Sequence, residues 1–238
     1  KGNSDIWKSV MLTDGKWSIP ENLGDSINTP EAEMTPFIHP DGRTLYFASK
    51  GHPGMGGADL FVSRTDANGT WSKAVNLGYP LNTAADDISL VVSATGDTAY
   101  FSSDNFGGKG KTDIYSFLLP PSAKPNPVSY VKGIVTDAKT KTRLQASFEL
   151  SDLSSGDVVV RSLSDAYTGE FLLSLPAGKE YALSVSQKGY MFYSLHFSTG
   201  QGKDRFKPEI ITVELQPFAL GQSMILHNIF FETDQHTL

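Results

Sequence analysis

The sequence predicts an all-β protein in which a repeated array of short strands precedes a smaller β-sandwich. Three observations predict this class. The chain of 238 residues contains 22 glycines and 13 prolines, and these separate short runs rich in Val, Ile, Phe and Tyr, as in proteins with many strands joined by turns. A set of motifs recurs at a constant spacing of 54 residues. No segment shows the apolar period of an amphipathic helix over more than a turn or two.

Composition restricts the class of function. Hydrophobic residues make up 39% of the chain and charged residues 19%, which is typical of a globular protein. The formal net charge of −6 argues against a nucleic-acid partner, because proteins that bind nucleic acids usually carry a basic surface. No apolar run approaches the roughly 20 residues of a membrane-spanning helix, and we expect neither a signal peptide nor a lipidation site at the N-terminal residues. The absence of cysteine excludes disulfides, Cys-ligated zinc and a thiol nucleophile.

The repeat is defined by motifs that stay in one register. An Asp followed by two apolar residues occurs at Asp5, Asp59 and Asp113, and an Asn-Leu-Gly turn occurs at Asn22 and Asn76. Further pairs at the same offset are Trp17 with Trp71, Asn28 with Asn82, Tyr46 with Tyr100, and Ser49 with Ser103. The register continues without an insertion, so chance is a poor explanation for it.

Each complete copy predicts four short antiparallel strands. In the first complete copy they cover residues 34–39, 44–49, 59–63 and 70–75. The turn Pro40–Arg43 separates the first two, because Pro presets φ and the following Gly takes the left-handed position. The glycine-rich loop Gly51–Gly57 and a hairpin at Asn68-Gly69 separate the others. Four antiparallel strands in about 50 residues are the size of one β-propeller blade.

Residues 1–119 hold only part of such an array. Residues 5–24 supply the last two strands of a blade, 33–78 a full blade, and 86–118 the first three strands of another. Because a closed propeller needs roughly four to eight blades, we expect the others on an upstream part, or on a separate piece, of the parent protein. The last copy stops one strand short, which favours a ring closed by an upstream strand. Completion by residues 5–24 is the alternative.

A second domain follows a proline-rich segment. Residues 120–127 contain four prolines, which favours an extended, semi-rigid spacer at a domain boundary. Seven strand-like runs then predict a β-sandwich over residues 128–217. The runs cover roughly residues 129–136, 145–150, 158–163, 170–175, 181–186, 191–197 and 209–215.

Both regions resemble known families. Phe37–Ser49, the glycine-rich loop and Asp59-Leu60-Phe61 together resemble the PD40 (WD40-like, TolB-type) propeller repeat, although Ala94-Thr95-Gly96 replaces Pro-Asp-Gly in the next copy. The sandwich resembles the transthyretin-like carboxypeptidase regulatory-like domain, which implies structural roles and no peptidase chemistry. The matching residues are Lys132-Gly133, Asp165, Gly169-Glu170-Phe171, Pro176-Ala177-Gly178, Tyr181 and Gly189-Tyr190. Residues 218–238 resemble the first strand of an OmpA-like peptidoglycan-binding domain, truncated before its ligand-contacting parts.

This order of domains is similar to outer-membrane-associated OmpA-family proteins of Bacteroidota, among them components of the type IX secretion system. The resemblance implies a non-catalytic scaffold in the periplasm, associated with the outer membrane and anchored to peptidoglycan by a domain absent from this chain. Other cell-envelope proteins, including secretion-system components, are the implied partners. Two alternatives stay open: glycan or peptide binding by the propeller face, and an enzyme whose catalytic residues lie in other blades or another domain.

The residues themselves carry no catalytic motif. There is no G-x-S-x-G nucleophile elbow. Gly110-Lys111-Thr112 imitates the end of a phosphate loop, but Asn105 stands where that loop requires Gly, and a strand follows. The five histidines form no zinc-binding pair at helical spacing; they are His39, His52, His196, His227 and His236. We therefore predict no enzymatic activity, no metal and no cofactor. The acidic pair Asp86-Asp87 favours a solvated or backbone-capping role over a cation site.

Repetition separates structural residues from functional candidates. The aspartates that recur with the period predict a hydrogen bond at the entry of each third strand, and Trp7, Trp17 and Trp71 predict packing between copies. The glycine-rich loops differ between copies and are the better place to seek a binding site. The candidate partner-binding residues are His52 and Met55 in one loop and Asn105, Phe106 and Lys109 in the next. A mobile loop without a binding role is the alternative.

Overall fold

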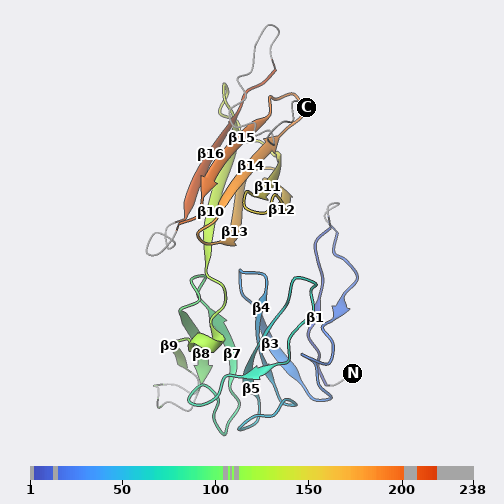
Figure 1. The fold of residues 1–238 in the computed structure, drawn as a ribbon, viewed down its shortest axis with the longest axis vertical. Coiled ribbons are helices and arrows are strands. Elements are labelled where there is room, and N and C mark those ends of the chain that lie inside the picture. The colour runs from blue at the N-terminus through green and yellow to red at the C-terminus, as the bar shows by residue number, and fades with distance from the viewer. Residues whose placement is uncertain are drawn as a thin grey trace. The chain divides into compact units, whose positions relative to one another are not determined.

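A computed structural model describes residues 3–12, 16–103, 107, 109, 113–200 and 208–218. It is all-β, with one short 3-10 helix among these residues (Figure 1). The chain divides into two compact units, Lys1–Val128 and Ser129–Leu238, and each is described by itself. The expected OmpA-like strand, at residues 225–234, lies outside the described residues.

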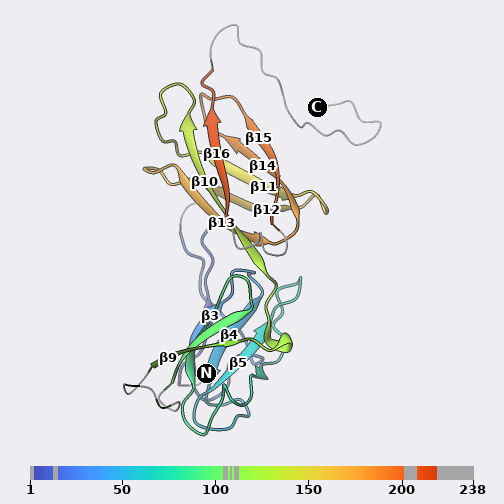
Figure 2. The same cartoon turned by 90° about the vertical axis from the view of Figure 1, so that its left-hand side faces the viewer.

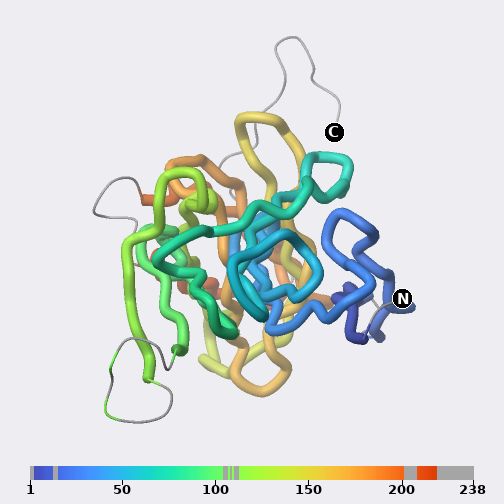
Figure 3. The backbone as a smooth tube through the Cα atoms, turned by 90° about the horizontal axis from the view of Figure 1, so that it is seen from below, coloured from blue at the N-terminus to red at the C-terminus, as the bar shows by residue number. Residues whose placement is uncertain are grey.

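The first unit contains three separate antiparallel sheets. The strands β1 (Trp7–Lys8) and β2 (Glu21–Asn22) form a two-stranded sheet. A four-stranded sheet has the order β3-β4-β5-β6, and a three-stranded sheet has the order β7-β8-β9. Their strands are β3 (Glu33–Ile38), β4 (Thr44–Ser49), β5 (Asp59–Arg64), β6 (Val75–Asn76), β7 (Ile88–Val92), β8 (Thr98–Ser103) and β9 (Asp113–Leu118). Figure 3 shows the chain passing through them in sequence order, from blue to green.

The period of 54 residues found in the sequence is also a structural period. Phe47 pairs with Phe61 between β4 and β5, and Phe101 pairs with Tyr115 between β8 and β9, in the same register. Each copy also has a bulge in its first strand, where Thr35 (φ 46°) and Ser89 (φ 64°) adopt left-handed backbone conformations. Such conformations are uncommon for residues other than Gly, so their recurrence marks two copies of one design.

The fourth strand is shorter than the sequence predicts. We expected a strand over residues 70–75, whereas β6 covers only Val75 and Asn76. In the part before β6 the main-chain ladder is interrupted, although the Ser72 N–H still donates to the Arg64 oxygen (2.8 Å). Side chains add to it there: the Ser63 hydroxyl donates to the main-chain oxygen of Ser72 (2.6 Å), and the Arg64 N–H donates to Ser72 Oγ (3.1 Å). Polar side chains that bond to the main chain compete in this way with sheet formation.

Two hydrophobic cores lie between successive copies. One contains Leu60 and Val62 of β5 together with Leu90, Val92 and Ala99 of the next copy. The other contains Ile6, Ile27, Leu45, Phe47 and Phe61. Each copy therefore buries its apolar side chains against its neighbour, as repeat architectures do.

The proline-rich segment lies within the first unit instead of standing free as a spacer. Its 3-10 helix η1 (Pro121–Ala123) buries Ala123, whose main-chain oxygen accepts a hydrogen bond from the Tyr46 hydroxyl (2.6 Å). The Arg64 guanidinium donates to the main-chain oxygens of Ser122 and Lys124, both at 2.9 Å. Because prolines lack N–H donors, the carbonyls of this segment are free to accept these side-chain bonds.

The second unit is a sandwich of seven strands in two sheets, which lie near the regions expected from sequence. One sheet has the order β13-β10-β16, in which β10 and β16 are parallel; the other has the order β12-β11-β14-β15 (Figures 1 and 2). The strands are β10 (Val128–Asp137), β11 (Ser147–Asp152), β12 (Val158–Leu163), β13 (Glu170–Pro176), β14 (Glu180–Ser186), β15 (Tyr193–Ser198) and β16 (Glu209–Leu215).

One core fills the space between the two sheets of the sandwich. On β14 the side chains of Tyr181, Leu183 and Val185 are buried and alternate with more exposed ones, as the sequence pattern predicts. The ring of Phe171 on β13 lies over Gly133 of the neighbouring strand β10, where a Cβ atom would collide with it. The glycine in the Lys132-Gly133 motif therefore serves packing.

Candidate functional site

The glycine-rich loop is shaped by the Asp that begins β5. Asp59 Oδ2 accepts hydrogen bonds from the N–H groups of Met55 (2.9 Å) and Gly56 (3.2 Å). A Cβ on Gly56 would lie 2.5 Å from the main-chain oxygens of Thr83 and Ala85, so the close approach of two backbones requires Gly there. For Asp59, this confirms the structural hydrogen bond that the sequence predicts at the entry of the third strand.

His52 has a structural contact. Its Nε2 lies 2.9 Å from the main-chain oxygen of Ile27, and its ring packs against Phe47 and Phe61 with centroid distances of 5.9 and 5.2 Å. Met55, in the same loop, is 54% exposed. The two candidates therefore differ: His52 is half-buried and holds the loop to the body of the repeat, and Met55 is accessible.

The candidates of the second loop are only partly covered by the structure. Asn105 and Phe106 lie outside the described residues, and Lys109 is exposed. The structure therefore does not test whether the five candidates form one site, and a binding role for them stays a prediction.

Asparagine side chains form the same network in both copies. Asn28 Oδ1 accepts from the N–H of Ile6 (2.8 Å), and Asn28 Nδ2 donates to the Ile6 oxygen (3.0 Å). One period later, Asn82 makes the same two bonds to Leu60, at 2.7 and 3.0 Å. Each of these amides also donates to the Asn of the Asn-Leu-Gly turn. These buried amides are committed to main-chain hydrogen bonds and serve the fold.

The acidic residue at the entry of the first strand differs in its hydrogen bonding between the two copies. Glu33 uses both carboxylate oxygens, accepting from Thr29 N–H, Thr29 Oγ1 and Ser49 Oγ at 2.7–2.9 Å. Its counterpart Asp87 is one methylene shorter and fully buried, and its Oδ1 has no hydrogen-bond partner among the described residues. Burial raises the pKa of Asp87, and the nearby charges of Asp59 and Asp86 act in the same direction.

Asp86 has the backbone-capping role favoured by the sequence. Its Oδ1 accepts from the N–H of Ala58 (2.7 Å), and Lys50 lies beside it with Nζ–Oδ1 at 3.3 Å. The Ala58 N–H bond and then Lys50 lower the pKa of Asp86. In the described part of the chain, no group of three or more His, Cys, Asp or Glu side chains is arranged to hold a metal ion.

A pocket of about 830 Å³ beside β1 and β2 was not anticipated from sequence. Its lining includes Asp5, Trp7, Asn22, Asp25 and His52. Trp7, which we expected to pack between copies, is 56% exposed. Its counterpart Phe61 is 2% exposed beneath the rings of Phe47 and His52. The sequence signal for this pocket is that Asp5 and Trp7 stand at alternate positions of the chain leading into β1, because such residues share a face of an extended segment.

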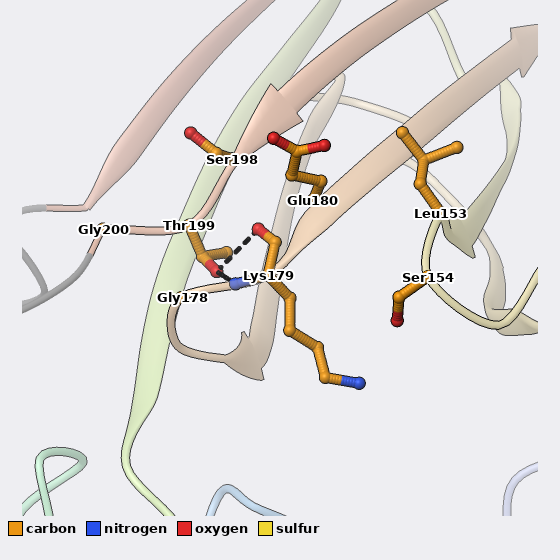
Figure 4. A pocket seen from close by; sticks show the side chains of 8 residues that line it. All are labelled: Leu153, Ser154, Gly178, Lys179, Glu180, Ser198, Thr199 and Gly200. Atoms are coloured by element: carbon orange, nitrogen blue, oxygen red, sulfur yellow. Dashed lines mark hydrogen bonds between the residues drawn. The ribbon is translucent and has the colours of Figure 1, made fainter.

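A second pocket, of about 710 Å³, lies at one end of the sandwich (Figure 4). Its polar groups are largely committed to the fold: Thr199 Oγ1 bonds to the N–H (3.0 Å) and the oxygen (3.2 Å) of Lys179, and Lys179 Nζ pairs with Asp152. Figure 4 shows the Lys179 and Glu180 side chains extending in opposite directions from the chain. No set of converging free polar groups distinguishes this pocket.

No helix among the described residues is long and apolar enough to cross a membrane. No family model matches the chain. No curated protein matches it either.

Several solved structures show a distant similarity. S.CueP has 20% identity and a TM-score of 0.31, with 51% of this chain and 73% of that protein covered. The group B streptococcus pilus 2b backbone protein has 15% identity and a TM-score of 0.33, with 78% and 97% covered. A C-terminal fragment of the pilus adhesin SpaC from Lactobacillus rhamnosus GG has 14% identity and a TM-score of 0.32, with 86% and 85% covered. These scores are too low to assign a shared fold.

The comparisons contradict the family assignment expected from the sequence. We expected an OmpA-family protein with a PD40 propeller and a carboxypeptidase regulatory-like domain, yet no family model matches and the similar structures just named are CueP and pilus proteins. The sequence motifs misled for a physical reason. Pro-Asp-Gly turns, glycine-rich loops and an Asp at a strand entry specify a four-stranded antiparallel unit, whereas membership of a propeller depends on how many units close into a ring. In the described residues the first unit is an open series of three sheets.

Proposed function

We propose that this chain is a non-catalytic protein-interaction module, a scaffold of the cell envelope, and that the open strand β9 is its docking edge. The observation that carries the proposal is the difference between β9 and its counterpart one repeat earlier. Strand β5 pairs with β4 on one side and β6 on the other, whereas β9 pairs only with β8 among the described residues.

The main chain of β9 offers hydrogen bonds to a partner. Leu60 directs its N–H and C=O away from β4, where Asn82 bonds to both. Ile114 occupies the same position opposite β8 as Leu60 does opposite β4. Its N–H and C=O therefore point away from β8, toward the open side. An edge of this kind accepts an additional strand from another chain.

Two of the three exposed side chains of β9 are large and apolar. Ile114 is 81% exposed and Leu118 is 78% exposed. Leu60, the counterpart of Ile114, is 1% exposed because the next copy covers it. A partner strand that brings apolar side chains would bury the same surface on β9, since burial of apolar area is the main source of association energy.

The chemistry of the described residues supports a binding role without catalysis. The recurring Asp and Asn side chains hold loops and strand entries, as shown for Asp59, Asn28 and Asn82. Some of the similar structures are described as pilus proteins, and we extend to this chain only the location in the cell envelope. The narrower form of the proposal is the periplasm at the outer membrane, and cell fractionation with compartment markers tests it.

Site-specific photo-crosslinking in the native cell tests the docking edge. A photoreactive amino acid at Ile114 is expected to give a defined crosslinked product with an envelope protein, and one at Tyr167, 90% exposed on the sandwich, is expected to give none. Ser116→Pro removes an outward N–H without touching the β8 ladder, so it should abolish the product. Equal products at both positions, or a product that survives Ser116→Pro, would overturn the proposal.

A second candidate function is the binding of a glycan or peptide ligand. It is favoured by the pocket that contains the exposed Trp7, because aromatic side chains in concave sites are common anchors for ligands. Titration of the protein with oligosaccharides and peptides, followed by the fluorescence of Trp7, tests it. If neither oligosaccharides nor peptides change the fluorescence, this second candidate function is rejected.

A further inference from the structure

Two side chains on one face of the chain at β1, Asp5 and Trp7, line the pocket beside β1 and β2. Ile6 points into the core and is 6% exposed. Asp5 and Trp7, on either side of it, therefore face the opposite way, into the pocket. Asp25 reaches the pocket from the turn that follows β2, where it is exposed.

The pocket carries negative charge and an aromatic surface. Two carboxylates, Asp5 and Asp25, are among its lining residues, and the lining contains no Lys or Arg. Trp7 is more than half exposed beside them. A cation placed there would gain from the carboxylates and from the electron-rich face of the indole ring.

The amides of the pocket are already committed. Asn28 bonds to the main chain of Ile6 and to Asn22 Oδ1. Asn22 Nδ2 donates to Asp5 Oδ2 (2.9 Å). A sugar would need such amides to recognise its hydroxyl groups, whereas a cation needs only the carboxylates and the ring. The carboxylates and the exposed indole of the lining therefore favour a cation.

We propose that this pocket binds the guanidinium group of an arginine side chain presented by a protein partner. The inference rests on the proposed interaction function and specifies the chemistry of the partner. Guanidinium is the better fit among the basic groups, because it is planar, stacks on indole and donates hydrogen bonds in two directions at once. The pocket volume of about 830 Å³ falls in the range of small-ligand sites and exceeds what one arginine side chain requires, so flanking residues of the partner fit as well.

A titration followed by NMR tests the proposal on the whole chain. The indole N–H signal of Trp7, assigned with Trp7→Phe, is recorded while N-acetyl-arginine amide is added. N-acetyl-citrulline amide is the matched control, since it has nearly the same shape and no charge. We expect a saturable shift with arginine, a weaker one with N-acetyl-lysine amide and none with citrulline. An equal response to citrulline, or a response to an oligosaccharide with none to arginine, would overturn the proposal.

Variants identify the contributing groups. Trp7→Ala is expected to weaken arginine binding by about twofold to thirtyfold, the range of a cation–π contact. Asp25→Asn is expected to weaken arginine binding and to make the remaining binding less sensitive to salt concentration. Asp25 is exposed in a turn, so this variant keeps the test valid if Trp7→Ala disturbs the hairpin. Asp157→Asn, which changes the charge equally at an exposed site on the sandwich, should bind as the unchanged protein does.

The outcomes separate this inference from the proposed function. Loss of arginine binding with an intact crosslink at Ile114 rejects only the pocket. Arginine binding with no crosslink rejects β9 as the docking edge. If Asp25→Asn and Asp157→Asn weaken binding equally, the effect is one of overall charge and the pocket assignment is wrong.

Discussion

His39 Nε2 lies 3.0 Å from the main-chain oxygen of Ser93, the residue that occupies the same position one repeat later. The N–H of Asp41 donates to Nδ1 of the same ring (3.1 Å). Nδ1 is therefore an acceptor, and Nε2 carries the proton that bonds to Ser93. His39 is 1% exposed, so a neutral buried imidazole joins two consecutive copies.

His39→Ala should lower the free energy of unfolding of the first unit by about 1–3 kcal/mol, because it leaves the Ser93 oxygen and the Asp41 N–H buried without partners. Urea denaturation followed by tryptophan fluorescence measures this unit alone, since Trp7, Trp17 and Trp71 all belong to it. His196→Ala, at an exposed position on the sandwich, should leave the transition unchanged. An equal effect of the two variants would contradict the assignment.

Acid should destabilise the first unit through Asp41. Burial opposes ionisation of this carboxyl, but hydrogen bonds from the N–H groups of Arg43 and Thr44 and from the Thr44 hydroxyl outweigh it and hold its pKa well below the usual value of 3.8. A carboxyl with a lowered folded-state pKa stabilises the fold above about pH 4, and this contribution is lost as the pH falls toward the folded-state pKa.

The test compares the unchanged protein with Asp41→Asn. At pH 6 the variant should be less stable by about 1–3 kcal/mol, since it lacks the second acceptor oxygen for Thr44 Oγ1 and the Asn126 N–H. Between pH 4 and pH 2 the difference should shrink. A difference that is constant over this range would show that ionisation of Asp41 plays no part.

Neutralisation should have opposite effects at Asp87 and Glu33, which are equivalent residues of successive copies. The pKa of Asp87 is raised, mainly by burial, so its stabilising contribution is complete below pH 3.8 and is lost as the pH rises through the folded-state pKa. At pH 7 we therefore expect Asp87→Asn to raise the stability of the first unit by roughly 1 kcal/mol. Toward pH 4 this gain should fade.

Glu33→Gln is the matched comparison. Glu33 accepts hydrogen bonds at both side-chain oxygens and Gln keeps only one of these acceptors, so the substitution should cost about 1–3 kcal/mol at pH 7. Thermal unfolding of both variants by tryptophan fluorescence measures the contrast. If both Asp87→Asn and Glu33→Gln lower the stability, the unpartnered oxygen of Asp87 does not destabilise the folded protein.

The proline-rich segment should loosen when Tyr46 loses its hydroxyl. Tyr46→Phe keeps the buried ring and removes the 2.6 Å bond to the Ala123 oxygen. We expect a loss of about 0.5–1.5 kcal/mol and faster hydrogen exchange at the amides of Ser122 to Lys124. Exchange elsewhere in the first unit should change less. Unchanged exchange at residues 122–124 would mean that the Arg64 bonds alone hold the segment.

Local structure was largely predictable from the sequence. Turn residues and alternating apolar positions located β4, β5 and the sandwich strands, because these signals act within a few residues. The length of β6 was not predictable, since it depends on Ser63 and Ser72 meeting across the sheet. The position of residues 120–127 was not predictable either, because proline content describes stiffness and not the Tyr46 and Arg64 side chains that bind the segment.

The candidate site was less predictable than the fold. Sequence comparison between copies identified Met55 as an accessible loop residue, but it could not show that His52 bonds to Ile27. It also assigned Trp7 to packing, because Phe61 at the same position of the next copy is aromatic. Exposure of Trp7 depends on which rings lie above it in space, and the repeat pattern contains no information about that.

The constant offset of 54 residues makes the copies interchangeable parts. Excision of residues 33–86, which are one full period, would join Ala32 to Asp87. Each remaining strand would then begin next to a residue equivalent to its present neighbour. Recombination within the gene could therefore remove or add whole copies of 54 residues. A deletion or insertion of any other length would move the asparagines out of register with the strands that they bond to. The array would therefore vary in the number of its copies more easily than in the size of any one of them.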